Sequence, residues 1–176
     1  LRSLRFEPEQ ELVVTSHGYN ACKNAAEFVT ERAGARVVVA EVPFPIDSSD
    51  QVLEAVLAAV TPRTRLVLID HVTSQTGVVL PLKRITDEAI SRGAEVLVDG
   101  AHAPGMVRLD LESLGATYYT GNCHKWICAP KGAGFLYVRE DRQESVRPLV
   151  ISHGANAAAG DRSRFHLEHD WTGTRD

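Results

Sequence analysis

Several features that would mark a membrane or secreted protein are missing from this sequence. No apolar run approaches the roughly 20 residues that a membrane-spanning helix requires, and the first residues do not resemble a signal peptide. The chain has only 3 cysteines among 176 residues, an odd number without the spacing of a disulfide framework. We therefore expect a protein of a reducing, cytoplasmic compartment that does not bind membranes.

Motifs for several kinds of ligand are missing as well. The sequence contains neither GxGxxG nor GxxxxGK[ST], so nucleotide binding has no motif support. A net charge of −4 gives no sign of the basic surface that nucleic acids need, so we expect no such partner. CxxC and HExxH are also absent. The remaining metal-site hypothesis is weak, because two of its candidate ligands are adjacent in the chain and adjacent residues rarely ligate one ion. Its candidate ligands would be Cys123, His124, Cys128, His102 and Asp99, and we predict no metal.

Apolar runs that alternate with amphipathic segments predict an α/β protein. Strands are expected at residues 12–15, 36–42, 65–69, 95–98, 117–120 and 132–138. Helices are expected from residue 20 to about 33, at 50–60 after a cap at Ser48 or Ser49, at 81–91, and briefly before residue 117. Such βαβ spacing predicts a mainly parallel sheet between helical layers, a three-layer α/β/α sandwich. The last strand follows a short connection, which favours an antiparallel arrangement.

Polar residues follow two of the predicted strands at the point where each strand ends. Asp99 and His102 follow the first, and Asn122, His124 and Lys125 follow the second. The carboxyl ends of parallel strands face one crevice, where ligands bind. A carboxylate and a lysine in one crevice are the pair that pyridoxal phosphate (PLP) needs, because the lysine forms a Schiff base and the acid keeps the pyridine nitrogen protonated.

Each of these residues also has an ordinary structural interpretation. A lysine is by default a solvated charge, but the chain has only four, and Lys125 is followed by Trp126 and Ile127, whose apolar side chains favour a nucleophilic amine. Asp99 would serve equally as a helix N-cap or turn acid, and His102 as a packing residue. We interpret Cys123 and Cys128 as packing residues.

Six short motifs in order resemble the class V aminotransferase family of PLP-dependent, fold-type I enzymes. The resemblance covers nearly the whole chain and is strongest to isopenicillin N epimerase-like members, near the cysteine desulfurases. The motifs are SHGYNA (16–21), DHVTSQTG (70–77), VDGAHAPG (98–105), TGNCHKW (120–126), APKGAGFLYV (129–138) and GTRD (173–176).

The resemblance implies a role for each matching residue. Lys125 would form the Schiff base and move the substrate α-proton, Asp99 would pair with the pyridine nitrogen, and His102 would contact the phenolic oxygen. Tyr19 matches the residue that stacks on the ring, with His17 as the alternative.

Further residues match contacts to the phosphate, the substrate and a partner subunit. Ser74 would face a cofactor oxygen or the substrate carboxylate, and Asn122 and His124 would contact the phosphate. Thr174 matches a threonine that reaches the neighbouring subunit's phosphate. The resemblance therefore implies a homodimer with shared active sites.

The family pattern also sets expectations for domain organisation and reaction. A preceding segment with a phosphate-binding Gly/Thr turn and a trailing small domain have no counterpart, so we expect residues 1–176 to be a PLP-binding large domain, a fragment. Residues 152–164 would form a mobile or partner-contacting loop. The motifs favour an epimerase-like enzyme acting at Cα of an amino acid or amine. The alternatives are a carbon–sulfur lyase or cysteine desulfurase, and a non-catalytic truncated module.

Overall fold

A six-stranded mixed sheet organises the structure, a computed structural model that describes residues 1–147 and 149–150. The strands are β1 (Glu11–Thr15), β2 (Arg36–Ala40), β3 (Thr64–Asp70), β4 (Glu95–Gly100), β5 (Tyr118–Asn122) and β6 (Gly134–Val138). Their order is β2-β1-β3-β4-β5-β6. The first five are parallel and β6 runs antiparallel to β5, as the short connection predicted.

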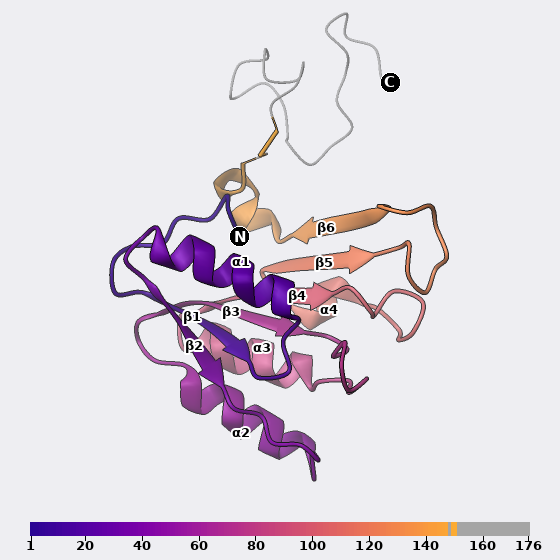
Figure 1. Cartoon of the computed structure of the whole chain (residues 1–176), viewed down its shortest axis with the longest axis horizontal. Coiled ribbons are helices and arrows are strands. Elements are labelled where there is room, and N and C mark those ends of the chain that lie inside the picture. Colours follow the sequence, from indigo (N-terminus) through magenta and orange to yellow (C-terminus); the bar gives the residue numbers. More distant parts are fainter. Residues whose placement is uncertain (148, 151–176) are drawn as a thin grey trace, which may run out of the picture.

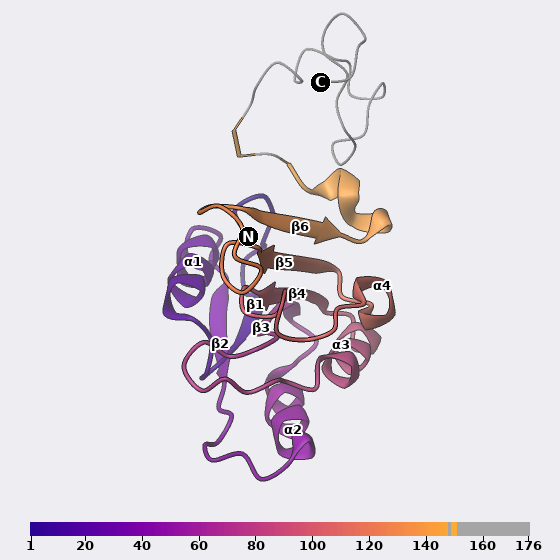
Figure 2. The same ribbon diagram turned by 90° about the vertical axis from the view of Figure 1, so that its right-hand side faces the viewer.

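Helices cover both faces of the sheet (Figures 1 and 2). The helix α1 (Asn20–Glu31) lies on one face, and α2 (Ser49–Ala59), α3 (Leu82–Ser91) and the short α4 (Leu111–Leu114) lie on the other. A 3-10 helix, η1 (Glu140–Ser145), follows β6 and was not predicted. The predicted three-layer α/β/α architecture is therefore confirmed.

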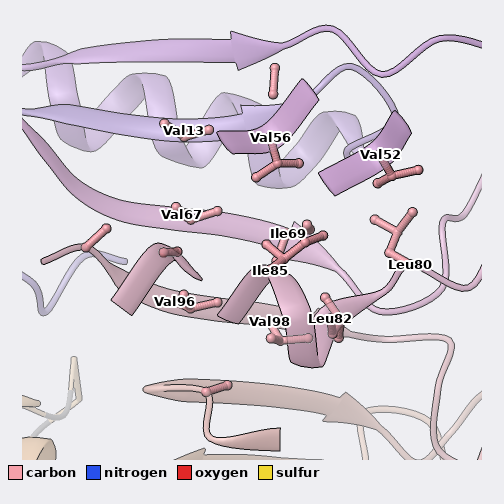
Figure 3. Packing of buried hydrophobic residues seen from close by; sticks show 14 of the residues in the cluster. Val13, Val52, Val56, Val67, Ile69, Leu80, Leu82, Ile85, Val96 and Val98 are labelled. Atoms are coloured by element: carbon pink, nitrogen blue, oxygen red, sulfur yellow. The ribbon is translucent and has the colours of Figure 1, made fainter. Parts of the chain in front are cut away.

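Two apolar cores form because successive strand residues point to opposite faces of the sheet. Val13, Val67 and Val96 pack against α2 and α3 (Figure 3). Leu12 and Leu66, each one position earlier, pack on the α1 side. Burial on both faces explains why the strands read as continuous apolar runs rather than alternating ones.

Element boundaries differ from the predictions where side chains compete with backbone pairing. The strand predicted to reach residue 42 ends at Ala40, because the Ser16 hydroxyl accepts a hydrogen bond from the Val42 N–H at 3.0 Å and draws the chain into the loop after β1. The α2 cap, left open between two serines, is Ser48, whose Oγ accepts from the Gln51 N–H. Pro81 takes the position before α3 rather than its first turn.

A buried carboxylate fastens the amino ends of the strands. Glu11, fully buried at the start of β1, forms ion pairs with Arg36 at 2.6 Å and Arg63 at 2.8 Å and accepts a hydrogen bond from the Thr61 hydroxyl. This network lies at the edge of the sheet opposite to the carboxyl ends of the parallel strands. Within the described part of the chain, no helix has the length and apolar character to cross a membrane.

Candidate active site

The predicted site residues gather where β1, β3, β4 and β5 end. In register, Asp70 at the end of β3 pairs with Asp99 on β4, and Asp99 pairs with Thr120 on β5. Lys125 follows Thr120 by five residues, in the loop that connects β5 to β6. The parallel register therefore brings the carboxylate and the amine to neighbouring strand ends, as the sequence predicted.

Asp99 is held in place from both sides of its carboxylate. Its Oδ1 accepts the Ala101 N–H at 2.9 Å, and its Oδ2 lies 3.0 Å from the thiol of Cys22 on α1. Burial, followed by the hydrogen bond to Asp99 and its negative charge, raises the pKa of Cys22 to about 12. The thiol therefore stays protonated and donates to the Asp99 carboxylate.

Asp70 is a second acid at this edge, which the sequence reasoning did not single out. Burial, and after it the negative charge of Asp99, raises the pKa of Asp70 to about 7. Its carboxylate accepts the backbone N–H of Tyr19, so it fixes the turn that leads from β1 into α1. The signal was present, because β3 and β4 both end an apolar run in aspartate.

Lys125 contacts His102, the predicted neighbour from the β4 loop. The Lys125 Nζ lies 3.2 Å from His102 Nε2, and the indole Nε1 of Trp126 lies 3.2 Å from the Nδ1 of the same ring. Burial, followed by the positive charge of Lys125, lowers the pKa of His102, while Asp99 acts in the opposite direction. The charges of Lys125 and Asp99 therefore both act on the His102 imidazole, in opposite directions.

A close approach of two loops makes this contact possible. Gly105, in the loop after β4, has a φ of +87°, and a Cβ there would lie 2.9 Å from the carbonyl carbon of Trp126. The β5–β6 loop is held from within by the Ala133 carbonyl, which accepts the Cys123 N–H at 3.0 Å and lies 3.0 Å from the His124 Nδ1. As a result Lys125 is partly buried, whereas the next side chain, Trp126, is 53% exposed.

The two candidates for stacking on the ring have different surroundings. His17 is buried, its Nε2 lies 3.0 Å from the Val42 carbonyl, and its Nδ1 lies 3.2 Å from the Thr76 hydroxyl. Tyr19 is 50% exposed at the start of α1. Tyr19 is therefore the more accessible of the two side chains.

The remaining predicted residues are less closely gathered. Asn122 is partly buried at the end of β5, and Ser74 is exposed in the loop after β3. His124 shares the Asn122 loop, but its Nδ1 contacts the Ala133 carbonyl, which leaves only Nε2 for a ligand. Thr174 lies outside the described residues.

The structure gives little support to the interpretation of Cys123 and Cys128 as packing residues or to the metal-site hypothesis. Cys128 is exposed, with a φ of +59°, so its interpretation as a packing residue is wrong, because the tight loop turns it outward. Cys123 is partly buried. Among the described residues, no three His, Cys, Asp or Glu side chains are grouped so that they could hold a metal ion.

The donor set fits pyridoxal phosphate. A carboxylate, an imidazole and a lysine amine share one edge, which is the chemistry that the pyridine nitrogen, phenolic oxygen and aldehyde require.

Comparisons with known proteins agree on one family. A family model described as Aminotransferase class-V matches residues 1–165. The isopenicillin N epimerase of Amycolatopsis lactamdurans is 41% identical over 160 residues, which cover 88% of this chain and 40% of that protein. A probable chloroplastic L-cysteine desulfhydrase of Arabidopsis thaliana is 34% identical over 186 residues, which cover 99% of this chain and 38% of that protein. The chain thus spans about two fifths of the length of these curated relatives.

A solved structure gives the same picture. The cystine C–S lyase C-DES, in complex with its reaction product cysteine persulfide, superposes with a TM-score of 0.76 at 27% identity. The match covers 82% of this chain and 39% of the lyase chain. A lysine-to-alanine mutant of C-DES carries glycine covalently linked to its PLP cofactor.

Proposed function

Because this chain belongs to the class V aminotransferase family, we propose that it binds PLP and acts at Cα of an amino acid or amine substrate. The observation that carries the proposal is the shared edge of Lys125 and Asp99, whose opposite charges both act on His102. The resemblance found in the sequence is confirmed at the level of the family. The PLP that C-DES holds supports the same cofactor here.

The residues at the carboxyl ends of the parallel strands would each have a separate role. Lys125 would bind the cofactor through Nζ, and the same nitrogen would take up the proton that leaves the substrate Cα. Asp99, held by the Cys22 thiol and the Ala101 N–H, would place its carboxylate beside the pyridine nitrogen. His102 would donate to the phenolic oxygen. When bound, PLP supplies an electron-accepting ring that stabilises charge at the substrate Cα.

The other predicted residues would orient the cofactor. Tyr19 covers one face of the ring, in a turn that Asp70 fixes through the Tyr19 backbone N–H. Asn122 and the free Nε2 of His124 bind the phosphate, and Ser74 binds a cofactor oxygen or the substrate carboxylate. Together these contacts would hold the ring against the strand ends and keep water away from Lys125.

For the reaction outcome, we propose an epimerase-like activity, which the 41% identity to an isopenicillin N epimerase supports. The second candidate is carbon–sulfur bond cleavage, which the identity to an L-cysteine desulfhydrase and the likeness to C-DES support equally. Both outcomes begin with loss of the Cα proton to Lys125. They differ in whether that proton returns or a sulfur group leaves.

We also propose that these residues form the large cofactor-binding domain of a longer polypeptide, since they match about two fifths of each curated relative. A homodimer that shares its sites through Thr174 is part of the same proposal. The rival is a non-catalytic module that keeps the fold without binding PLP.

A reduction experiment separates the enzyme from the module. The full-length polypeptide is incubated with PLP, treated with borohydride, digested and analysed by mass spectrometry. We expect a pyridoxyl adduct on Lys125, an absorption band above 400 nm before reduction, and loss of both in Lys125→Ala. Lys131→Ala is the matched control, because Lys131 is an exposed lysine of the same loop. An adduct spread over surface lysines, or none, would support the module.

An exchange experiment separates the two reaction outcomes. The full-length polypeptide is incubated in deuterated water with a panel of L-amino acids, including cysteine and cystine. Deuterium at Cα with inverted configuration and no keto acid supports epimerisation. Pyruvate with released sulfur supports carbon–sulfur cleavage.

A further inference from the structure

His102 receives contacts on both ring nitrogens from two residues that are adjacent in the chain. The indole Nε1 of Trp126 lies 3.2 Å from Nδ1, and the Nζ of Lys125 lies 3.2 Å from Nε2. The two aromatic rings are tilted by 52°, with centroids 6.2 Å apart, so the indole meets the imidazole with its N–H and does not stack on it. None of the family motifs gives Trp126 a role.

We propose that Trp126 is a positioning residue, whose indole N–H selects the His102 tautomer that presents Nε2–H to Lys125. An indole nitrogen only donates, so Nδ1 must be the acceptor and carries no proton. A neutral imidazole has one ring proton, which therefore resides on Nε2. The proton faces the position of the Lys125 nitrogen.

The two neighbours of His102 compete for a single lone pair. A charged lysine side chain has three donors and no acceptor, so it would need Nε2 without a proton. That arrangement moves the ring proton to Nδ1, opposite the indole N–H, and breaks the Trp126 hydrogen bond. We therefore assign the single lone pair, on Nδ1, to the indole N–H of Trp126 rather than to a donor from Lys125.

The surroundings of His102 also disfavour a second proton on its ring. Burial and the positive charge of Lys125 lower the pKa of His102, and only Asp99 opposes them. A doubly protonated ring would also leave the indole N–H facing another donor. Both effects act against the charged imidazole.

The main chain of Trp126 is held independently of its indole ring. The close approach of Gly105 concerns the backbone carbonyl of Trp126, while the ring itself is 53% exposed. A substitution that removes only the N–H should therefore leave the loop and Lys125 in place. This separates positioning by the hydrogen bond from support by packing.

One consequence rests on the proposed function. An Nε2–H that faces Lys125 in the cofactor-free protein is also the donor that a negatively charged phenolic oxygen requires. Trp126 would then keep His102 ready as a donor in both states. The tautomer itself can be measured without any cofactor.

The test uses the full-length, cofactor-free polypeptide with ¹⁵N-labelled histidine, studied by long-range ¹H–¹⁵N correlation at pH 8. The signals of His102 are assigned from their loss in His102→Gln. We expect the Nε2–H tautomer in the wild type and a shift of about fivefold toward Nδ1–H in Trp126→Phe, the ratio that corresponds to a hydrogen bond of about 1 kcal/mol. Ile127→Ala, at an exposed neighbour of Trp126 that donates nothing from its side chain, should leave the tautomer unchanged.

A second variant protects the test against misfolding. Replacing Trp126 by 3-benzothienylalanine exchanges the indole N–H for sulfur and keeps the ring shape, so it should produce the same shift as Trp126→Phe. An Nδ1–H tautomer in the wild type, or an unchanged ratio in both variants, would overturn the proposal. A pyridoxyl adduct at Lys125 together with an unchanged ratio refutes only this inference, whereas a shifted ratio without any adduct refutes only the proposed function.

Discussion

The thiol of Cys22 donates to the carboxylate of Asp99 across 3.0 Å, although the two residues are 77 positions apart in the chain. The contact joins the first turn of α1 to the end of β4. It places an uncharged donor beside the acid that we assign to the pyridine nitrogen. The turn before α1 is held at the same edge, because the Tyr19 N–H binds Asp70.

The first prediction concerns the reactivity of the cysteines. Burial and Asp99 raise the pKa of Cys22 to about 12, and the thiolate is the reactive form. We expect iodoacetamide at pH 8 to alkylate Cys22 at least about 100-fold more slowly than a thiol of ordinary pKa. The exposed Cys128 is the internal control, followed by mass spectrometry of the same digest. Equal rates would contradict the Cys22–Asp99 contact.

The second prediction concerns Asp70 and pH. Its pKa is raised from the ordinary 3.8 to about 7, so the folded protein holds a proton that the unfolded chain releases. Stability should therefore fall as the pH rises from about 4 to 7 and then level off. Urea unfolding measured across this range should show a free energy of unfolding that decreases with pH in the wild type. This slope should be absent in Asp70→Asn.

The matched control for Asp70 is Asp87→Asn, which changes a carboxylate that is 57% exposed on α3. It should leave the slope unchanged. Asp99→Asn should lower the pKa of Asp70 toward its ordinary value without restoring it fully, because burial is the larger cause. A pKa of Asp70 that does not respond to Asp99→Asn would show that the two acids are not neighbours.

The third prediction concerns the buried anchor at the other edge of the sheet. Burial alone would raise the pKa of Glu11, but hydrogen bonds from Thr61, Arg36 and Arg63 outweigh it and lower the pKa to about 2. The stabilisation of the folded protein by these contacts of the Glu11 carboxylate is complete above pH 4.5, and it is lost as the pH falls toward 2.

Glu11→Gln should lower the free energy of unfolding at pH 7 by about 2 kcal/mol, because it weakens several charge-assisted hydrogen bonds at once. Urea unfolding at pH 7 and pH 3 measures the effect, and the difference between variant and wild type should shrink at pH 3. Glu88→Gln, at an exposed position of α3, should change little at either pH. An equal loss at both pH values would indicate packing rather than charge.

The fourth prediction concerns the contact between the two loops of the site. Gly105→Ala places a Cβ 2.9 Å from the Trp126 carbonyl carbon, at a φ of +87° that alanine tolerates poorly. We expect less pyridoxyl adduct at Lys125, because the loops must separate and His102 moves away from the amine. The measurement is the borohydride reduction described above.

Gly93→Ala is the control for Gly105→Ala. Its φ of +88° imposes the same backbone strain, but no atom lies within 4 Å of the added Cβ. It should cost about 1 kcal/mol of stability and leave the adduct intact. A similar loss of adduct in both variants would mean that strain, rather than the loop contact, was responsible.

Most of the fold followed from sequence pattern because its causes are local. Apolar runs end in Asp70 and Asp99, and helical periodicity fills the spaces between them, so the parallel sheet and the placement of Asp99 and Lys125 at neighbouring strand ends were predictable. Boundaries were less predictable where a distant side chain intervenes, as Ser16 does at the end of β2.

The details of the site were less accessible to sequence reasoning. The partnership of Cys22 with Asp99 joins a helix to a strand end that no periodicity connects, and the indole contact of Trp126 depends on how two loops meet. Cys128 was expected to pack, but a tight turn exposes it. In each case the outcome depends on tertiary geometry rather than on residue type.

The Glu11 network separates the stability of the sheet from the chemistry of the site. It links the amino ends of β1, β2 and β3 through Arg36 and Arg63, whereas Asp99 and Lys125 lie at the carboxyl ends of the strands. A substitution among the residues at the carboxyl ends can therefore alter the site while the ion pairs at the amino ends still hold the strands together.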